Sequence, residues 1–140
     1  MLESAAQGTA RGMALVRAAD AMLRSLGGQE LSLLFPMVTF PEDPAAQLGL
    51  ADPGVEEVQL APVVIRNLRA ESRGTRVRFE FLVPASVVWS KVEERHVSSP
   101  EALFELALGI AQDGRLLRIE KFDTEWFAGI AYLYRVTAAG

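Results

Sequence analysis

A chain of 140 residues, of which 50% are hydrophobic and 23% charged, is long enough to bury a substantial core and too apolar to be largely disordered. Its net charge of −4 excludes a general electrostatic attraction to nucleic acid or anionic lipid, and its lack of cysteine excludes disulfides, thiolate metal sites and cysteine nucleophiles. We expect one domain over residues 1–140, without a membrane span or a secretory signal, and a cytoplasmic location.

The first predicted element is an amphipathic helix over residues 9–26, which ends at Gly27-Gly28 because a left-handed residue after a helix favours glycine. Arg17 and Arg24 share its polar side. We expect residues 1–8 to be frayed. The apolar stripe, at helical spacing, comprises Leu15, Val16, Ala19, Met22, Leu23 and Leu26.

A first strand is predicted over residues 29–39, where Leu31 and Leu33 occupy alternate positions and Pro36 marks an edge or a bend. From residue 40 to residue 55 the periodicity disappears, and prolines, glycines and acidic residues indicate a loop. Residues 40–55 make a longer connection than most in a compact domain, so we expect this loop to be either functional or mobile.

Two further strands are predicted over residues 57–68 and 75–83, joined by a polar turn. The core face of the second comprises Val77, Phe79, Phe81 and Val83. Its arginines alternate onto the opposite face, unlike those of RNA-binding sheets, so we expect no specific nucleic-acid binding. Pro84 interrupts the run, and another strand is predicted over residues 86–92, around Trp89.

A second helix is predicted over residues 99–112, with Ser98 or Ser99 as its N-cap and Pro100 at its first position. Its buried stripe is expected to comprise Leu103, Phe104, Leu106, Ala107, Leu108 and Ile110. Such a helix would lie directly before the C-terminal hairpin.

The last quarter of the chain predicts that closing hairpin. A turn at Asp113-Gly114 leads into a strand over residues 116–122, and a loop containing Trp126 and Phe127 leads into the final strand, residues 131–137. Two helices and five or six strands, joined mostly by short turns, predict an α+β domain built on an antiparallel curved sheet or a small β-barrel.

The residues that could support catalysis are few and scattered. His96 is the only histidine, and it lies in a charged segment where we expect a solvated side chain. Adjacent carboxylates make poor acid–base pairs, because neighbouring residues of a strand point to opposite faces. Such pairs occur at Glu42-Asp43, Glu56-Glu57 and Glu93-Glu94. We therefore expect neither an enzyme nor a bound cofactor or metal ion.

Trp126 and Phe127 are unusual residues for the loop of a hairpin, and two interpretations stay open. In the first, the pair folds back as a lid on the barrel. In the second, it forms an exposed anchor for a partner protein, since aromatic residues dominate interface hot spots.

Three segments resemble a known family. They read Gly-Gly-Gln-Glu-Leu-Ser-Leu-Leu at residues 27–34, Gly-Arg-Leu-Leu-Arg-Ile at 114–119 and Tyr-Leu-Tyr-Arg-Val at 132–136. With the long loop between the first and second segments, this order is similar to that of the small neck proteins of tailed bacteriophages, the head-closure and head–tail joining proteins of phages and prophages. The predicted helix over residues 99–112 is more substantial than in the usual pattern of that family.

The resemblance implies a structural role. Several copies would form a ring between the portal or adaptor and the tail, first in the cytoplasm during assembly and then in the virion. The loop over residues 40–55 would reach a neighbouring subunit or project toward the channel, where its acidic side chains would repel DNA. The residues that the resemblance makes candidates for protein contacts are Arg17, Arg24, Phe40, Glu42, Asp43, Asp52, Trp126 and Phe127.

Two other classes of function stay open. A small-molecule-binding module or an enzyme would use the mouth of the barrel, with Trp89, Trp126 and His96 lining a pocket beside nearby carboxylates. A regulatory partner protein would instead use the amphipathic first helix. Convergent titratable side chains in one pocket would favour the former class.

Overall fold

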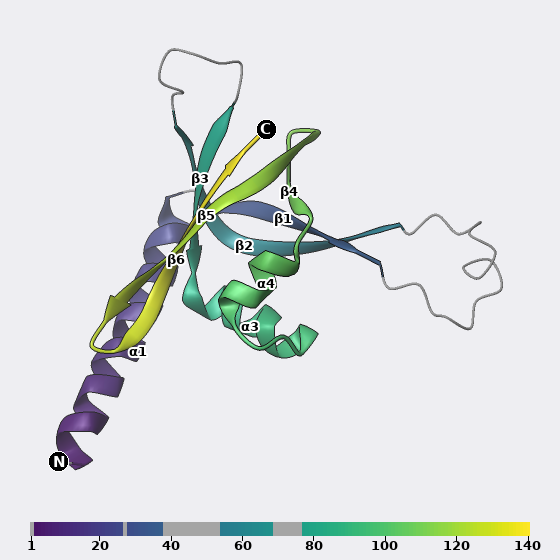
Figure 1. Ribbon diagram of the computed structural model, residues 1–140. Coiled ribbons are helices and arrows are strands. Elements are labelled where there is room, and N and C mark those ends of the chain that lie inside the picture. The colour runs from purple at the N-terminus through teal and green to yellow at the C-terminus, as the bar shows by residue number, and fades with distance from the viewer. Residues whose placement is uncertain (1, 27, 38–53, 69–76) are drawn as a thin grey trace, which may run out of the picture.

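The computed structural model describes residues 2–26, 28–37, 54–68 and 77–140, with side chains in the first helix described from Met13 onward. In this part of the chain, six antiparallel strands close into a barrel in the order β1-β2-β3-β6-β5-β4 (Figure 1). The predicted α+β class and small barrel are confirmed. The elements are α1 (Leu2–Ser25), β1 (Gln29–Pro36), β2 (Val55–Leu68), β3 (Arg78–Pro84), α3 (Ala85–Arg95), α4 (Pro100–Leu106), β4 (Gly109–Gln112), β5 (Arg115–Phe127) and β6 (Ile130–Ala139).

Strand β2 pairs with a different neighbour in each half. Its residues 55–63 face β1, and its residues 64–68 face β3. Pro62 lies beside this change of partner, a place that suits a residue without a backbone N–H. One long strand thereby takes part in both sides of the barrel.

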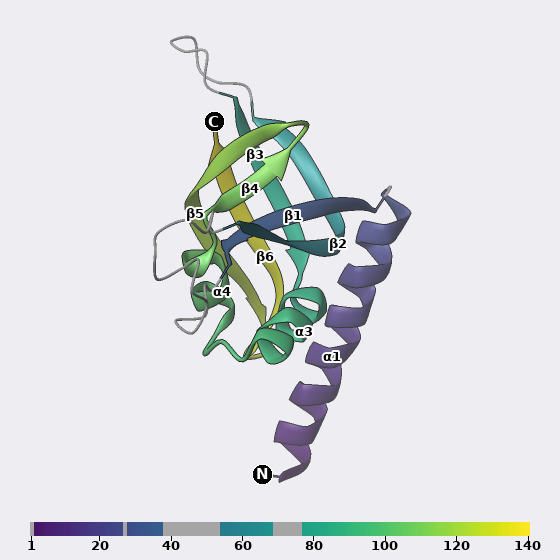
Figure 2. The same ribbon diagram turned by 90° about the vertical axis from the view of Figure 1, so that its right-hand side faces the viewer.

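A single apolar core fills the barrel. The alternation predicted for residues 75–83 is confirmed in β3, where Phe81 and Val83 are fully buried and Arg78 is exposed. Helices α3 and α4 lie across one end of the barrel (Figure 2) and add Val88 and Leu103 to the same core. Strand residues with almost no exposure are Leu31, Leu33, Leu60, Val63, Ile110, Leu117 and Val136.

The prediction of a strand over residues 86–92 was wrong, because these residues belong to helix α3. Pro84 precedes the helix in an extended conformation, and His96 ends it in a left-handed one, with φ 55°. Val88 and Val92 lie one turn apart on the buried face of the helix. Valine has a preference for strands, which led to the strand prediction. Here the two valines share one face of a helix, and that face packs on the barrel core.

The predicted second helix ends at Leu106, well before residue 112, and strand β4 begins at Gly109 after two connecting residues. The predicted start is confirmed, since the Ser99 hydroxyl accepts a hydrogen bond from the Ala102 N–H at 3.1 Å. The two leucines expected in the buried stripe beyond this point, Leu106 and Leu108, are exposed. After the helix the chain pairs with β1 and β5 as strand β4, and Gly109 at the start of this strand lies so close to the carbonyl of Leu117 that a Cβ would not fit.

The C-terminal hairpin is present and longer than predicted. Strand β5 continues to Phe127, past the expected end at residue 122, and β6 begins at Ile130. Ala128 and Gly129 form the turn with φ of 51° and 77°, the positive values that tight two-residue hairpin turns need. Trp126 and Phe127 therefore end a strand, and the prediction that placed them in a loop was wrong.

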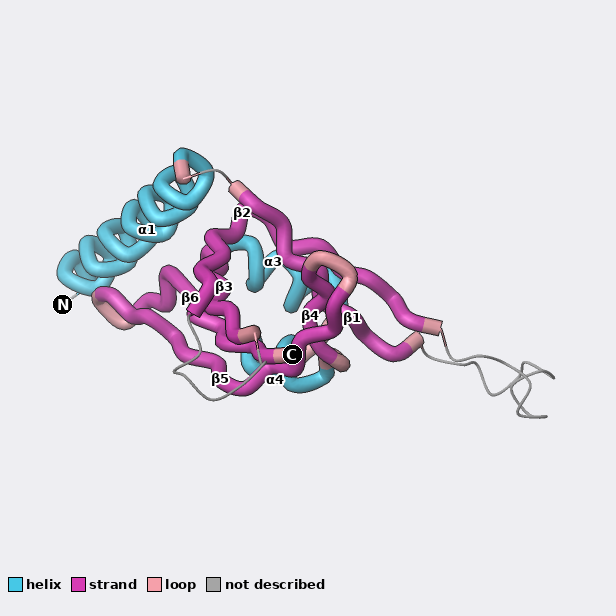
Figure 3. The backbone as a smooth tube through the Cα atoms, turned by 90° about the horizontal axis from the view of Figure 1, so that it is seen from above, coloured by secondary structure: helices cyan, strands magenta, loops and turns pink. Residues whose placement is uncertain are grey.

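Helix α1 lies outside the barrel and packs mainly against β6 (Figure 3). It begins at Leu2, earlier than the predicted start at residue 9. Among its described side chains, Val16, Ala19 and Leu23 are buried. Met22 and Leu26 were predicted to join them but are exposed, because the barrel covers only a narrow face of the helix. Within the described ranges, no helix combines the length and apolar character needed to cross a membrane.

Candidate functional site

The β5–β6 hairpin extends past the wall of the barrel. The last pairing of β6 with β3 joins Leu133 to Pro84, but β6 goes on pairing with β5 as far as Ile130, opposite Phe127. The tip of the hairpin lies beside α1 (Figure 1). We call the part of the hairpin beyond this last β3 pairing the overhang, which ends at Phe127 and Ile130. One face of the overhang is available to form a site with the neighbouring helices.

A groove of about 720 Å³ lies between the overhang, α1, α3 and the start of α4. This volume falls in the range of about 300–1,000 Å³ that is typical of small-molecule sites. Its aromatic side chains come from Trp89 of α3, Phe122 and Trp126 of β5, and Tyr134 of β6. Met13 of α1 also lines it. We call this site the aromatic groove.

The aromatic groove has a buried base and an exposed rim. Phe122 and Tyr134 are stacked, with ring centroids 5.2 Å apart and 24° between the ring planes, and Phe104 packs against Phe122 at 5.1 Å. Tyr134 is only 2% exposed, whereas Trp89 and Trp126 are 44% and 65% exposed. The stacked pair is held by the core, and the two indole rings are open to solvent.

Tyr134 places a neutral polar group in the aromatic groove. Burial raises the pKa of its hydroxyl above the ordinary value for tyrosine, a hydrogen bond from the Trp89 side chain lowers it, and the negative charge of Glu101 raises it. Because the pKa is raised overall, the hydroxyl stays protonated at neutral pH. It cannot supply a negative charge to the site.

Glu101 is the one charged residue among the described residues that line the aromatic groove. It lies in the first turn of α4 and is exposed. Among the described side chains, no lysine or arginine lies within ion-pair distance of its carboxylate. The aromatic groove therefore combines apolar and aromatic surface with one negative charge.

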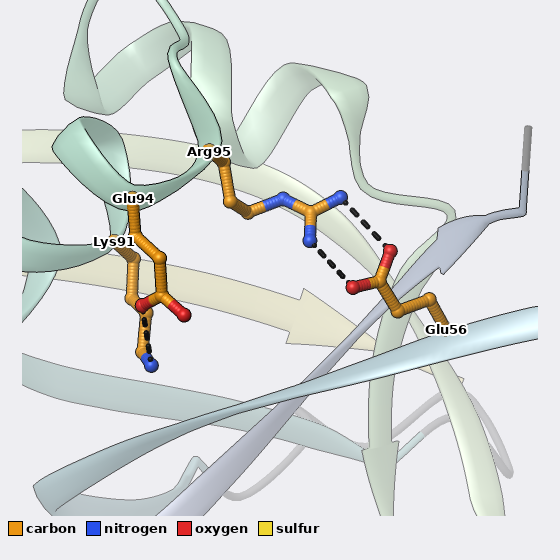
Figure 4. Close-up of polar contacts among 4 residues, drawn as sticks. All are labelled: Glu56, Lys91, Glu94 and Arg95. Atoms are coloured by element: carbon orange, nitrogen blue, oxygen red, sulfur yellow. Dashed lines mark hydrogen bonds and ion pairs between the residues drawn. The ribbon is translucent and has the colours of Figure 1, made fainter.

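An ion pair holds the far end of the helix that carries Trp89. The Arg95 guanidinium donates two hydrogen bonds to the Glu56 carboxylate of β2, at 2.9 and 3.2 Å (Figure 4). The same guanidinium lies over the ring of Phe35, 4.2 Å from its centroid. Lys91 and Glu94 pair at 3.0 Å on the surface of the helix. The Arg95–Glu56 contact thus connects the end of α3 to the barrel wall.

The structure brings together only part of what the sequence predicted for a binding pocket. Trp89 and Trp126 line the same groove, as expected for the small-molecule alternative, but His96 is not among the lining residues. Sequence reasoning missed Phe122, Glu101 and Tyr134. A signal was present for one side: Phe122, Thr124 and Trp126 occupy alternate positions of β5 and all line the groove.

The other candidate residues lie elsewhere. Arg17 and Arg24 are on the exposed side of α1, and Arg24 pairs with Asp20 at 3.4 Å. The candidates of the long loop, Phe40, Glu42, Asp43 and Asp52, lie outside the described residues. Within the described ranges, no three His, Cys, Asp or Glu side chains lie close enough to hold a metal ion together.

A second apolar surface lies at the start of β5 and was not predicted. Leu106, Leu108 and Leu116 are 59%, 52% and 59% exposed. The last two line one shallow hollow with Ile119 and Ala139, and the charged residues Arg118 and Glu120 also border it. We call these three leucines the distal surface. Trp126 and Phe127, 65% and 50% exposed, form the hairpin surface at the other end of the same strand.

No protein-family model, no curated protein and no solved structure matches the chain. The geometry of the site is therefore the main basis for proposing a function.

Proposed function

We propose that the chain is a non-catalytic structural protein that assembles head-to-tail into a ring, in the connector between the head and the tail of a phage or prophage. The observation that supports this most is the presence of two exposed apolar surfaces at opposite ends of β5. The resemblance of residues 27–34, 114–119 and 132–136 to phage neck proteins supplies the assembly in which such a ring would act.

A ring needs two different surfaces on each subunit. In a head-to-tail contact one surface meets the other surface of the next copy, whereas a two-fold dimer uses the same surface twice. The eleven steps from Leu116 to Phe127 along β5 span up to about 36 Å at the usual rise of a strand. The hairpin surface and the distal surface are thus too far apart to belong to one small patch.

The residues of the two surfaces suit protein contacts. Tryptophan is a frequent hot-spot residue of interfaces, and phenylalanine is enriched there. The hollow beside Leu108 and Leu116 offers apolar surface to an aromatic ring, next to the charged side chains of Arg118 and Glu120. We infer that Phe127 of one copy packs against Leu108 and Leu116 of the next. Trp126, on the face of the hairpin that lines the aromatic groove, would lie beside this contact.

The net charge of the chain is compatible with a position in the head–tail connector. A net charge of −4 provides no general attraction to DNA, as expected for a ring through which DNA passes without being held. In this proposal the partners are the portal or adaptor on one side and the tail proteins on the other. Arg17 and Arg24, on the exposed side of α1, are the candidate contacts to those partners.

Co-purification from the natural host tests the proposal. The tagged protein would be expressed during induction of a resident phage-like element, and lysates would be separated on a density gradient. We expect the tag to sediment with particles together with portal and tail proteins. A tag that stays at the top of the gradient while particles form would overturn the connector function.

The Phe127→Ser variant sharpens this test. It removes an exposed aromatic ring and should be lost from particles while folding normally. Lys121→Ser, in the middle of the same strand and also exposed, is the matched control and should remain with particles. Equal recovery of the two variants would show that the hairpin surface has no part in assembly.

A further inference from the structure

We propose that the aromatic groove binds a small organic cation, a quaternary or alkylated ammonium group. This inference can be separated from ring assembly, because four of the groove residues that carry it belong to neither the hairpin surface nor the distal surface: Trp89, Phe122, Tyr134 and Glu101. Trp126 is shared by the hairpin surface and the groove, so it is not used to separate the two proposals.

The first reason is the arrangement of the rings. Aromatic side chains of α3, β5 and β6 meet around one space, and the faces of such rings attract cations that have lost part of their water. Tryptophan is the best of these rings for a cation, and both tryptophans of the chain are here. An alkylated ammonium suits this site because its methyl groups contact apolar surface while its charge faces the rings.

The second reason is the sign of the charge. Glu101 is the only charged side chain among the described lining residues, so a cation gains a partner and an anion meets repulsion. The hydroxyl of Tyr134 and the small polar side chain of Thr124 add no charge. A neutral apolar ligand would fill the same space without using the carboxylate, so the preference for a cation is the property that identifies the site.

The third reason is that the base of the groove is already formed. Phe122 and Tyr134 are stacked on each other and supported by Phe104, so a ligand need not order them. Only the exposed rings of Trp89 and Trp126 would lose freedom on binding. A pre-formed base with an open rim is consistent with reversible binding from solution.

The composition of the chain provides a selective readout. Because its two tryptophans both line the aromatic groove, intrinsic tryptophan fluorescence reports on this site. Trp126 also belongs to the hairpin surface, so the titration is repeated in Phe127→Ser, where the proposed subunit contact is removed. The purified full-length protein would be titrated with choline and, separately, with its uncharged counterpart 3,3-dimethylbutan-1-ol at matched ionic strength. We expect a saturable fluorescence change with choline and an affinity at least about fivefold lower for the alcohol.

Two variants separate the charge from the fold. Glu101→Gln keeps the size of the side chain and should reduce the affinity for choline severalfold while leaving that for the alcohol unchanged. Glu105→Gln, on the same helix but outside the groove lining, should bind choline like the original protein. Phe127→Ser should also bind choline normally, so loss of ring assembly and loss of ligand binding are distinguished.

Three results would overturn the inference. Equal affinity for choline and the alcohol would show an apolar pocket without preference for a cation. An unchanged choline affinity in Glu101→Gln would remove the role of the carboxylate. The absence of any saturable fluorescence change up to the solubility of both probes would show that the groove takes neither.

Discussion

Leu116 and Phe127 lie at opposite ends of one strand, β5, and expose 59% and 50% of their surfaces to solvent. The residues between them hold the barrel together through pairing with β4 and β6. The same strand therefore builds the scaffold in its middle and presents an apolar side chain at each end. This arrangement places two separate exposed apolar surfaces on one strand, as the proposed head-to-tail assembly requires.

The exposed tryptophan of the hairpin should matter for assembly and little for folding. Trp126→Ala removes a ring that is 65% exposed, so we expect the free energy of unfolding to change by no more than about 1 kcal/mol. Phe81→Ala, at a fully buried position, should lower it by about 3–5 kcal/mol. Urea unfolding followed by circular dichroism compares the two variants. A large loss of stability in Trp126→Ala would mark this ring as part of the core.

The two leucines of α4 should differ sharply although they are three residues apart. Leu103 is fully buried and Leu106 is 59% exposed. We expect Leu103→Ala to lower the free energy of unfolding by about 2–5 kcal/mol and Leu106→Ala to change it by about 0.5 kcal/mol or less. Thermal unfolding of both proteins checks this. Similar losses in the two variants would mean that the helix continues past Leu106 with both side chains in the core.

The Arg95–Glu56 ion pair should make the free energy of unfolding depend on pH in the acidic range. The hydrogen bond and the charge of Arg95 hold the pKa of Glu56 below the ordinary value for glutamate, and the small effect of burial opposes them. Since the folded-state pKa is the lower one, the contribution is present above about pH 4.3, the usual glutamate value, and is lost as the pH falls through the folded-state pKa.

Replacement of the carboxylate isolates that contribution. In Glu56→Gln, the fall in Tm between pH 7 and about pH 3 should be smaller than in the original protein, because one titrating group has been removed. Glu93→Gln, on the exposed part of α3, is the matched control and should follow the original profile. If both variants show the same pH dependence as the original protein, the pKa of Glu56 is not lowered by Arg95.

The parts of the fold that were predicted correctly are elements with one face buried in the core and the other exposed to solvent. In β3 a regular alternation places Phe81 inside and Arg78 outside, and a period of two can be recognised in the sequence alone. The segment around Leu106 and Ile110 was assigned wrongly, because a short apolar run fits a helix and a buried strand equally well. Pairing of β4 with β1 and β5 decides between them, and this pairing is not visible in the local sequence.

The aromatic groove could be predicted from the sequence only in part, for a different reason. Its residues come from α1, α3, α4, β5 and β6, and only the packing of α1 and α3 beside the overhanging hairpin brings them together. Trp89 and Trp126 were predicted as pocket residues from their type. The contribution of Glu101 depends on where α4 begins relative to the hairpin, which is a property of the tertiary structure.

Mixing two variants tests head-to-tail assembly most directly. Phe127→Ser keeps an intact distal surface, and Leu116→Ser keeps an intact hairpin surface. At concentrations where the original protein forms larger species, each variant alone should be monomeric, and an equal mixture should give dimers that grow no further, as measured by size-exclusion chromatography with light scattering. Lys121→Ser should assemble like the original protein. If either variant alone forms a stable dimer, or if the mixture stays monomeric, the two surfaces do not bind each other and head-to-tail assembly through β5 is contradicted.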